Sequence, residues 1–197
     1  MPMELNLKAR ARAILRPWAA ALAAQGVTPS RLTLIGVVAA AVVGALLAAA
    51  PAEPIVLVLL PAGVAARLVL TALDRMLADE HGLGSPRDQI VNEVGNAAAD
   101  ALLYLPLALH PGVAGWLVVA VVVLGLIAEI AGLAALTIGG ERRTDGPQRS
   151  TDRALLFGVI GLILAADPRA AAWLPWLLVP AAALTGVTIY NRMRPAG

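Results

Sequence analysis

Six long apolar segments constrain this chain more than any other feature of its sequence. A helix that crosses a bilayer needs about 20 mostly apolar residues. Segments of this kind cover residues of about 31–50, 54–78, 90–109, 112–138, 153–166 and 171–191, of which the fifth is short. Only 14% of the 197 residues are charged, whereas a soluble domain carries about 25%. The sequence therefore predicts an all-α, polytopic membrane protein with six transmembrane helices in a single domain over residues 1–197.

The composition also excludes several classes of protein. The chain has no cysteine, which excludes disulfides, thiolate zinc sites and thiol catalysis. Hydrophobic residues make up 59% of the chain, which disfavours a disordered chain. The formal net charge is only +2, so we expect no nucleic-acid partner. Membrane lipid is the partner that this composition indicates.

The N-terminal segment is amphipathic. In residues 3–24 basic side chains are interleaved with apolar ones, and Trp18 lies in the apolar end of the segment like an interfacial anchor, which suits a helix lying on an anionic membrane surface. The alternative is a solvated N-terminus. With six spans, nearly all Lys and Arg residues outside the membrane fall on the side of both termini, and Arg169 falls on the other. The positive-inside rule therefore predicts that both termini are cytoplasmic.

Charged residues inside the predicted spans are the first candidates for function, because an intramembrane charge is unfavourable unless it has a partner or a role. They are Arg67, Asp74, Glu93, Asp100 and Glu129.

Two of the spans carry polar stripes, because residues three and four apart share one face of a helix. The second span presents Arg67, Thr71, Asp74 and Ala78, and the third presents Asp88, Asn92, Asn96 and Asp100. Facing stripes of this kind predict a water-filled cytoplasmic pocket for a metal and a phosphate. The alternative is that Arg67 pairs with Asp100 or Glu129 only to hold the helices together.

The polar loop at 139–153 is rich in arginine. It contains Arg142, Arg143, Arg149 and Arg153 beside a helix start at Asp152. Guanidinium groups at a helix N-terminus suit a phosphate-bearing ligand. The alternative is a loop whose positive charge serves only to set the topology.

The segment from Thr71 to Asn96 has the spacing of a known motif, D-x2-D-G-x2-A-R-x8-G-x3-D-x3-D. The residues at its positions are Thr71, Asp74, Arg75, Ala78, Asp79, Asp88, Asn92 and Asn96. In this spacing the chain resembles the CDP-alcohol phosphatidyltransferase family, and a bacterial branch of it. Segments 15–17, 26–33 and 142–154 extend the resemblance over nearly the whole chain.

This resemblance implies a fold, an activity and partners. Members of the family are six-span enzymes of phospholipid biosynthesis that transfer a phosphatidyl group from CDP-diacylglycerol to an alcohol and release CMP. Four motif aspartates hold two divalent metals, magnesium or manganese, and the last aspartate acts as the base. The resemblance further implies a homodimer, or a heterodimer with a paralogue. It places the protein in the bacterial inner membrane, with the site on the cytoplasmic side.

Carried onto this sequence, the motif assigns roles to particular residues. The implied metal ligands are Thr71, Asp74, Asn92 and Asn96, with Asp100 one helical turn further on, and the implied catalytic residues are Asn96 and Asp100. The implied nucleotide-binding residues are Arg75, Ala78, Asp79 and Asp88. The loop arginines would bind phosphate, and Arg67, Glu93 and Glu129 would form intramembrane charge pairs.

The motif is degenerate, because Asp74 is the only one of its four aspartates that this chain keeps. An asparagine offers a neutral oxygen to a cation that prefers charged ones, and its amide has no usable basicity. Three further changes introduce Arg75, Asp79 and Asp88. These three side chains predict a set of ion pairs in which a guanidinium replaces the metals as the fixed positive charge.

Three functions follow from this pattern. The first is a phosphatidyltransferase that needs a divalent metal. The second is a catalytically silent relative that binds lipid or nucleotide without metal, or that regulates an active paralogue. The third is a small lipid or solute transporter, which the sequence supports least because no span is visibly broken in mid-membrane.

Overall fold

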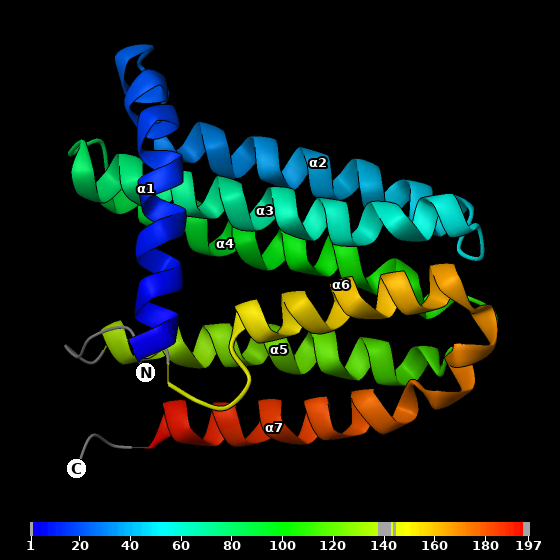
Figure 1. Ribbon diagram of the computed structural model, residues 1–197. Helices are drawn as coiled ribbons and strands as arrows, with labels where there is room; N and C mark the ends of the chain where they lie inside the picture. The colour runs from blue at the N-terminus through cyan, green and yellow to red at the C-terminus, as the bar shows by residue number, and fades with distance from the viewer. Residues whose placement is uncertain (1, 138–142, 144, 195–197) are drawn as a thin grey trace. The chain divides into compact units, whose positions relative to one another are not determined.

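The computed structural model describes the backbone of residues 2–137, 143 and 145–194, and the side chains of 9–134, 143 and 145–194. Within these residues all regular secondary structure is helical, and no strand forms. Figure 1 labels the α-helices in chain order. The elements are α1 (Pro2–Ala24), α2 (Pro29–Ala49), α3 (Pro54–Glu80), α4 (Pro86–Tyr104), the 3-10 helix η1 (Leu105–Leu109), α5 (Gly115–Thr137), α6 (Ser150–Ala166), the 3-10 helix η2 (Pro168–Trp173) and α7 (Pro175–Met193).

Each predicted span coincides with helical structure, and the third span consists of α4 followed by η1. Among the described residues, three helices are long and apolar enough to cross a membrane, namely Pro29–Ala49, Pro54–Glu80 and Gly115–Ala134. The short fifth span is the 17-residue α6. Six membrane crossings and a surface position for α1 therefore stay predictions.

Large apolar side chains cover the outside of these helices. On α2, Leu34 is 62% exposed, and on α5, Ile130 is 64% exposed. Apolar surface of this extent is unfavourable in water, because transfer out of water stabilises each such side chain by about 1.5–3 kcal/mol. The exposed apolar surface is typical of helices that face lipid.

The chain divides into two compact units. Unit 1 comprises Met1–Ala39 and Ala65–Ala99, and unit 2 comprises Ala40–Val64 and Asp100–Gly197.

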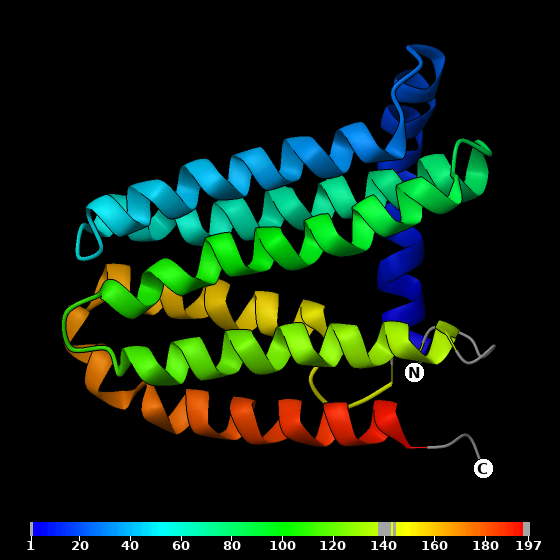
Figure 2. The ribbon, with the colours of Figure 1, turned by 180° about the vertical axis from the view of Figure 1, so that it is seen from behind.

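In unit 1, helix α1 runs across the direction of α2, α3 and α4 (Figures 1 and 2). Its buried Ala19 packs with Leu32 of α2 and with Leu73, Met76 and Leu77 of α3. Two ion pairs at the surface join α1 to the end of α3. Arg12 lies 3.8 Å from Asp79, and Arg16 lies 3.2 Å from Glu80.

In unit 2, α5 packs along α7, and α6 runs in the opposite direction to both (Figure 2). Glycines allow several backbones of this unit to approach closely. A Cβ atom on Gly44 would lie 2.1 Å from the carbonyl oxygen of Leu102, and one on Gly161 would lie 3.0 Å from that of Leu57. Small residues at helix contacts are typical of membrane bundles.

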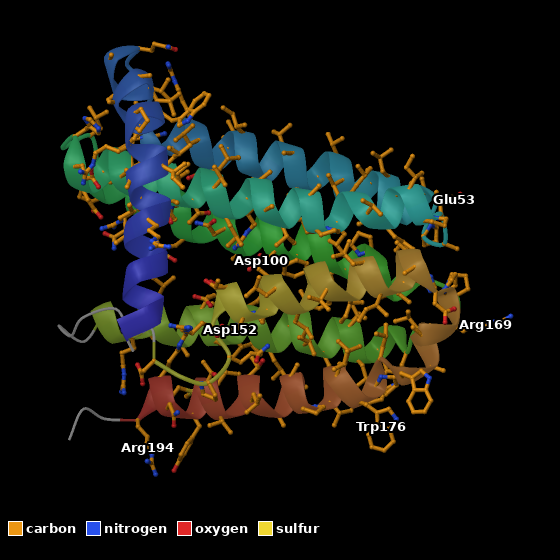
Figure 3. All side chains as sticks on the ribbon, in the orientation of Figure 1. Glu53, Asp100, Asp152, Arg169, Trp176 and Arg194 are labelled. Atoms are coloured by element: carbon orange, nitrogen blue, oxygen red, sulfur yellow. The ribbon has the colours of Figure 1, made fainter. Side chains whose placement is uncertain are left out.

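The two ends of unit 2 differ in chemistry (Figure 3). Arg169 and the exposed Trp176 lie at one end, and Asp152 and Arg194 lie at the other. An exposed tryptophan beside the end of an apolar helix is typical of a membrane interface. This arrangement agrees with a topology that separates Arg169 from the other arginines, although the orientation in the membrane stays a prediction.

The close contact at Gly44 generates a stability prediction. We expect Gly44→Ala to lower the thermal unfolding temperature in detergent, because overpacking destabilises by about 1–3 kcal/mol and the new Cβ would meet backbone. Gly186→Ala is the matched control, since no atom lies within 4 Å of its Cβ position. It should leave stability equal or slightly higher, because Ala is the better helix former. Equal unfolding temperatures for Gly44→Ala and the wild type would contradict the packing.

Candidate functional site

The four motif positions that correspond to aspartates come together inside unit 1. Thr71 and Asp74 lie three residues apart on α3, and Asn92 and Asn96 lie four apart on α4, so each pair shares one helix face. The two faces meet, because side chains from α3 and α4 hydrogen-bond to each other directly.

Asp74 is the centre of this cluster and is only 3% exposed. Its Oδ2 atom accepts a hydrogen bond of 2.7 Å from the hydroxyl of Thr33, on α2. The same oxygen accepts a hydrogen bond from the amide Nδ2 of Asn92. The buried carboxylate is therefore stabilised by donors from two other helices, as a buried charge requires.

The two asparagines continue the network away from Asp74. Asn96 Nδ2 donates to Asn92 Oδ1 at 2.9 Å and to the carbonyl oxygen of Asn92 at 2.8 Å. Asn96 Oδ1 accepts from the hydroxyl of Thr71 at 2.8 Å. Arg67 donates to the carbonyl oxygen of Asn96 at 3.3 Å. We call Thr33, Arg67, Thr71, Asp74, Asn92 and Asn96 the Asp74 network.

Thr33 is a member that the sequence analysis missed. It reaches Asp74 because α2 approaches α4 closely at Gly95, where a Cβ would lie 2.3 Å from the Thr33 methyl carbon. The signal for it is a hydroxyl residue one turn inside an otherwise apolar helix. Such a residue needs a hydrogen-bond partner within the protein.

The residues of the network do not fit a two-metal centre. Asp74 is the only carboxylate of the network. Asn92 directs its amide N–H group toward Asp74, whereas a cation bound between the two residues would need an oxygen ligand from each. No cluster of three or more His, Cys, Asp or Glu side chains suited to a metal occurs in the part of the chain that the structure describes. The cavity beside the network has a volume of about 10 Å³, which is room for about one water molecule.

The predicted set of ion pairs among Arg75, Asp79 and Asp88 is not formed. Arg75 is exposed and bonds to neither acid within the described residues. Asp79 is turned toward α1, where it pairs with Arg12. Ala78, a predicted nucleotide-binding residue, lies against the turn that follows α3. A Cβ atom on Gly84, in that turn, would lie 2.9 Å from the methyl carbon of Ala78.

Asp88 joins the start of α2 to the start of α4. Its carboxylate accepts hydrogen bonds from the backbone N–H of Ser30 at 3.3 Å and of Ser85 at 3.1 Å, and from both serine hydroxyls. The backbone N–H of Asp88 in turn donates to the Ser85 hydroxyl. This reciprocal pair is a capping box, which explains why α4 begins after Ser85. The carboxylate that was predicted to bind nucleotide is thus engaged within the protein.

The loop arginines lie in unit 2, except that Arg142 falls outside the residues that the structure describes. Arg143 pairs with Asp145 at 3.1 Å, and Arg149 pairs with Asp152 at 3.3 Å where α6 begins. Arg153 is buried and pairs with Glu129 of α5 at 2.9 Å.

A second buried arginine joins Arg153 at Glu129. Arg192 of α7 lies 3.5 Å from the same carboxylate oxygen. From the sequence, Arg192 is only one of the basic residues predicted on the side of both termini. Its position inside the last turn of an apolar helix is the signal that would have identified it.

The remaining predicted residues lie on α4. Glu93 is half-buried and belongs to unit 1. Asp100 is buried and belongs to unit 2, so it is not part of the unit that forms the Asp74 network. Its predicted roles as metal ligand and base stay predictions.

Comparison with a solved structure shows the fold. The chain matches phosphatidylinositol phosphate synthase from Mycobacterium tuberculosis, solved with CDP-DAG bound, with a TM-score of 0.68, 19% identity and coverage of 92% of each chain. The chain therefore has a CDP-alcohol phosphatidyltransferase-like fold. No protein-family model matches the sequence.

A curated relative gives the family. The chain is 36% identical over 189 residues to the inner membrane protein YnbA of Escherichia coli (strain K12), covering 96% of this chain and 94% of the relative. The chain belongs to the family of YnbA.

The Asp74 network generates a prediction about metal. In Asn92→Asp a second carboxylate replaces the donor to Asp74, so a hydrogen bond to a charged group worth about 1.5–3 kcal/mol is lost and two like charges meet. We expect Asn92→Asp to unfold at a lower temperature in EDTA than the wild type, and Mn²⁺ to restore part of the difference. Asn92→Ala loses the same bond without gaining a ligand, so Mn²⁺ should leave it unchanged. A variant Asn92→Asp with equal unfolding temperatures in Mn²⁺ and EDTA would overturn this account.

Asp88 generates a prediction about pH. Hydrogen bonds, first from the Ser30 hydroxyl and then from Ser85, lower the pKa of Asp88 from its ordinary value of 3.8. Because its pKa is lower in the folded state, the carboxylate stabilises the fold above about pH 3.8 and loses this effect as the pH falls through the folded pKa. We expect Asp88→Asn to unfold below the wild type at neutral pH and to approach it on acidification. A difference in unfolding temperature that is constant with pH would be the contrary result.

Proposed function

We propose that this protein is a non-catalytic member of its fold that binds a phospholipid of the CDP-diacylglycerol type without metal and does not transfer its phosphatidyl group. The observation that carries the proposal is the pair of hydrogen bonds from Thr33 and Asn92 to Asp74. These donors occupy the carboxylate oxygen that a bound cation would need. No step through a metal is therefore part of the proposal.

The same network supports the absence of transfer. Activating an alcohol requires a group that accepts its proton within hydrogen-bond reach. Asn96 stands at the position of the motif base, and its amide oxygen and nitrogen are both engaged, with Thr71 and Asn92. A neutral amide accepts no proton near neutral pH. The chain thus lacks a base at the position where the motif requires one.

Binding of a phosphate-bearing lipid has separate support. The solved neighbour holds CDP-DAG. Unit 2 carries four arginines near the end of α5, the start of α6 and the end of α7, namely Arg143, Arg149, Arg153 and Arg192. Guanidinium groups match the geometry of phosphate oxygens. We therefore place the phosphate of the lipid at these arginines, on the side of the membrane that the topology assigns to the cytoplasm.

Binding of CDP-diacylglycerol to the detergent-purified protein, in Mn²⁺ and then in EDTA, tests the proposal. We expect equal affinity in both, and no release of CMP when alcohols are added. Affinity that disappears in EDTA would mean that a metal site forms and would overturn the proposal. The absence of binding by folded protein in both conditions would also overturn it.

A restored variant provides the control for catalysis. It combines Asn92→Asp and Asn96→Asp with Arg75→Gly and Asp79→Arg, which returns four motif positions to the family pattern. Release of CMP by this variant alone would show that the four substitutions account for the silence of the wild type. Release of CMP by the wild type would refute the non-catalytic assignment.

A further inference from the structure

One face of α5 is shaped to receive two guanidinium groups. Gly125, Glu129 and Gly132 lie four and three residues apart and therefore on the same face of the helix. A Cβ on Gly125 would lie 2.6 Å from Nε of Arg153. One on Gly132 would lie 2.5 Å from the carbonyl oxygen of Arg143 and 3.3 Å from Nη1 of Arg192. Gly125 thus leaves room for the guanidinium of Arg153, and Gly132 leaves room for the backbone of Arg143 and for the guanidinium of Arg192.

The two arginines share one carboxylate oxygen. Nη2 of Arg153 lies 2.9 Å and Nη1 of Arg192 lies 3.5 Å from Oε1 of Glu129. The arginine side chains are 4% and 3% exposed, and that of Glu129 is 16% exposed. The Glu129 side chain is therefore the most exposed of the three.

Both arginines are also held independently of Glu129. Arg153 donates to the carbonyl oxygen of Gln148 at 3.2 Å. Arg192 donates to the carbonyl oxygens of Ala128 at 2.6 Å and of Asp145 at 3.1 Å. These neutral acceptors would keep the guanidiniums in place if the carboxylate moved away. Two buried cations in that state would require another anion.

We infer that Glu129 is an internal counter-ion that closes the arginine site, and that a phosphate-bearing ligand binds by displacing its carboxylate from Arg153 and Arg192. A phosphate offers several anionic oxygens to two guanidiniums and so matches the pair better than one shared carboxylate oxygen does. This inference rests on the proposed function and adds to it the regulation of the phosphate site.

A purely structural role for Glu129 and a competing role predict opposite changes in phosphate affinity when its carboxylate is removed. If the carboxylate only held the arginines in position, Glu129→Gln would disorder them and weaken phosphate binding. If the carboxylate competes with the ligand, the same change removes the competitor and strengthens binding. The sign of the change therefore separates the two roles.

The test is titration calorimetry of purified wild type, Glu129→Gln and Asp167→Asn with three probes. The probes are dioctanoyl phosphatidic acid, inorganic phosphate and dioctanoylglycerol, which lacks the phosphate. Asp167→Asn is the matched control, because it also removes one negative charge from unit 2, but from a carboxylate that accepts a hydrogen bond from the backbone N–H of Arg169 at the start of η2. We expect Glu129→Gln to bind phosphatidic acid about tenfold more tightly than the wild type, which corresponds to about 1.4 kcal/mol, and Asp167→Asn to change little.

The alternative outcomes are distinct. The inference would be overturned if Glu129→Gln bound phosphatidic acid no more tightly than the wild type, or if both variants gained affinity equally. Binding of phosphatidic acid by the wild type would in either case leave the proposed function standing. No binding of phosphatidic acid or phosphate by any folded form would overturn the inference, whereas the proposed function is decided by the separate titration with CDP-diacylglycerol. A gain for phosphatidic acid alone identifies a lipid headgroup, whereas a gain for inorganic phosphate as well identifies the free anion as sufficient, and either gain supports the exchange.

A measurement on the wild type decides the matter if Glu129→Gln does not fold. Carbodiimide labels accessible carboxyl groups, and peptide mass mapping locates the label. Displacement predicts that phosphatidic acid increases labelling at Glu129 several-fold relative to dioctanoylglycerol. Unchanged or reduced labelling at Glu129 in the presence of bound phosphatidic acid would overturn the inference.

Discussion

A buried carboxylate inside an apolar helix needs hydrogen-bond donors, and the donors to Asp74 connect the three helices α2, α3 and α4 in unit 1. In a low-dielectric surrounding an isolated carboxylate is strongly unfavourable, so donors must come from neighbouring helices. Thr33 supplies one from α2 and Asn92 another from α4. The contact at Gly95 brings α2 and α4 close enough for this arrangement. Asp74 is thus hydrogen-bonded by side chains of two neighbouring helices.

The same principle operates in unit 2 with the charges reversed. There two buried guanidiniums need an anion, and Glu129 provides it on a face of α5 that glycines keep open. The two sites differ in what they offer to a ligand. The side chains of Thr33, Thr71, Asp74, Asn92 and Asn96 hydrogen-bond within the Asp74 network, whereas Arg153 and Arg192 contact the same carboxylate oxygen of Glu129. The chain shares its fold with a phosphatidylinositol phosphate synthase. This fold is compatible with phosphate binding at the arginines around Glu129 and with the absence of catalysis at the Asp74 network.

The polar residues that the helical spacing brought together were predictable, because a stripe with steps of three and four always lies on one face. Thr71, Asp74, Asn92 and Asn96 meet as these stripes indicate. The partners of Asp79 and Asp88 were not predictable in this way. Arg12 lies on α1 and Ser30 lies at the start of α2, and only the crossing of those helices with α3 and α4 brings them within reach.

The sequence by itself determined that the chain is helical, that it carries apolar spans, and which faces of those spans are polar. These properties follow from local composition and from the helical period, which need no knowledge of neighbours. The tertiary structure decided the partner of each polar group, including Thr33 for Asp74 and Arg192 for Glu129. Such pairing depends on how closely two helices approach. That distance is set by glycines and side chains far apart in the sequence, so it emerges only when the helices pack.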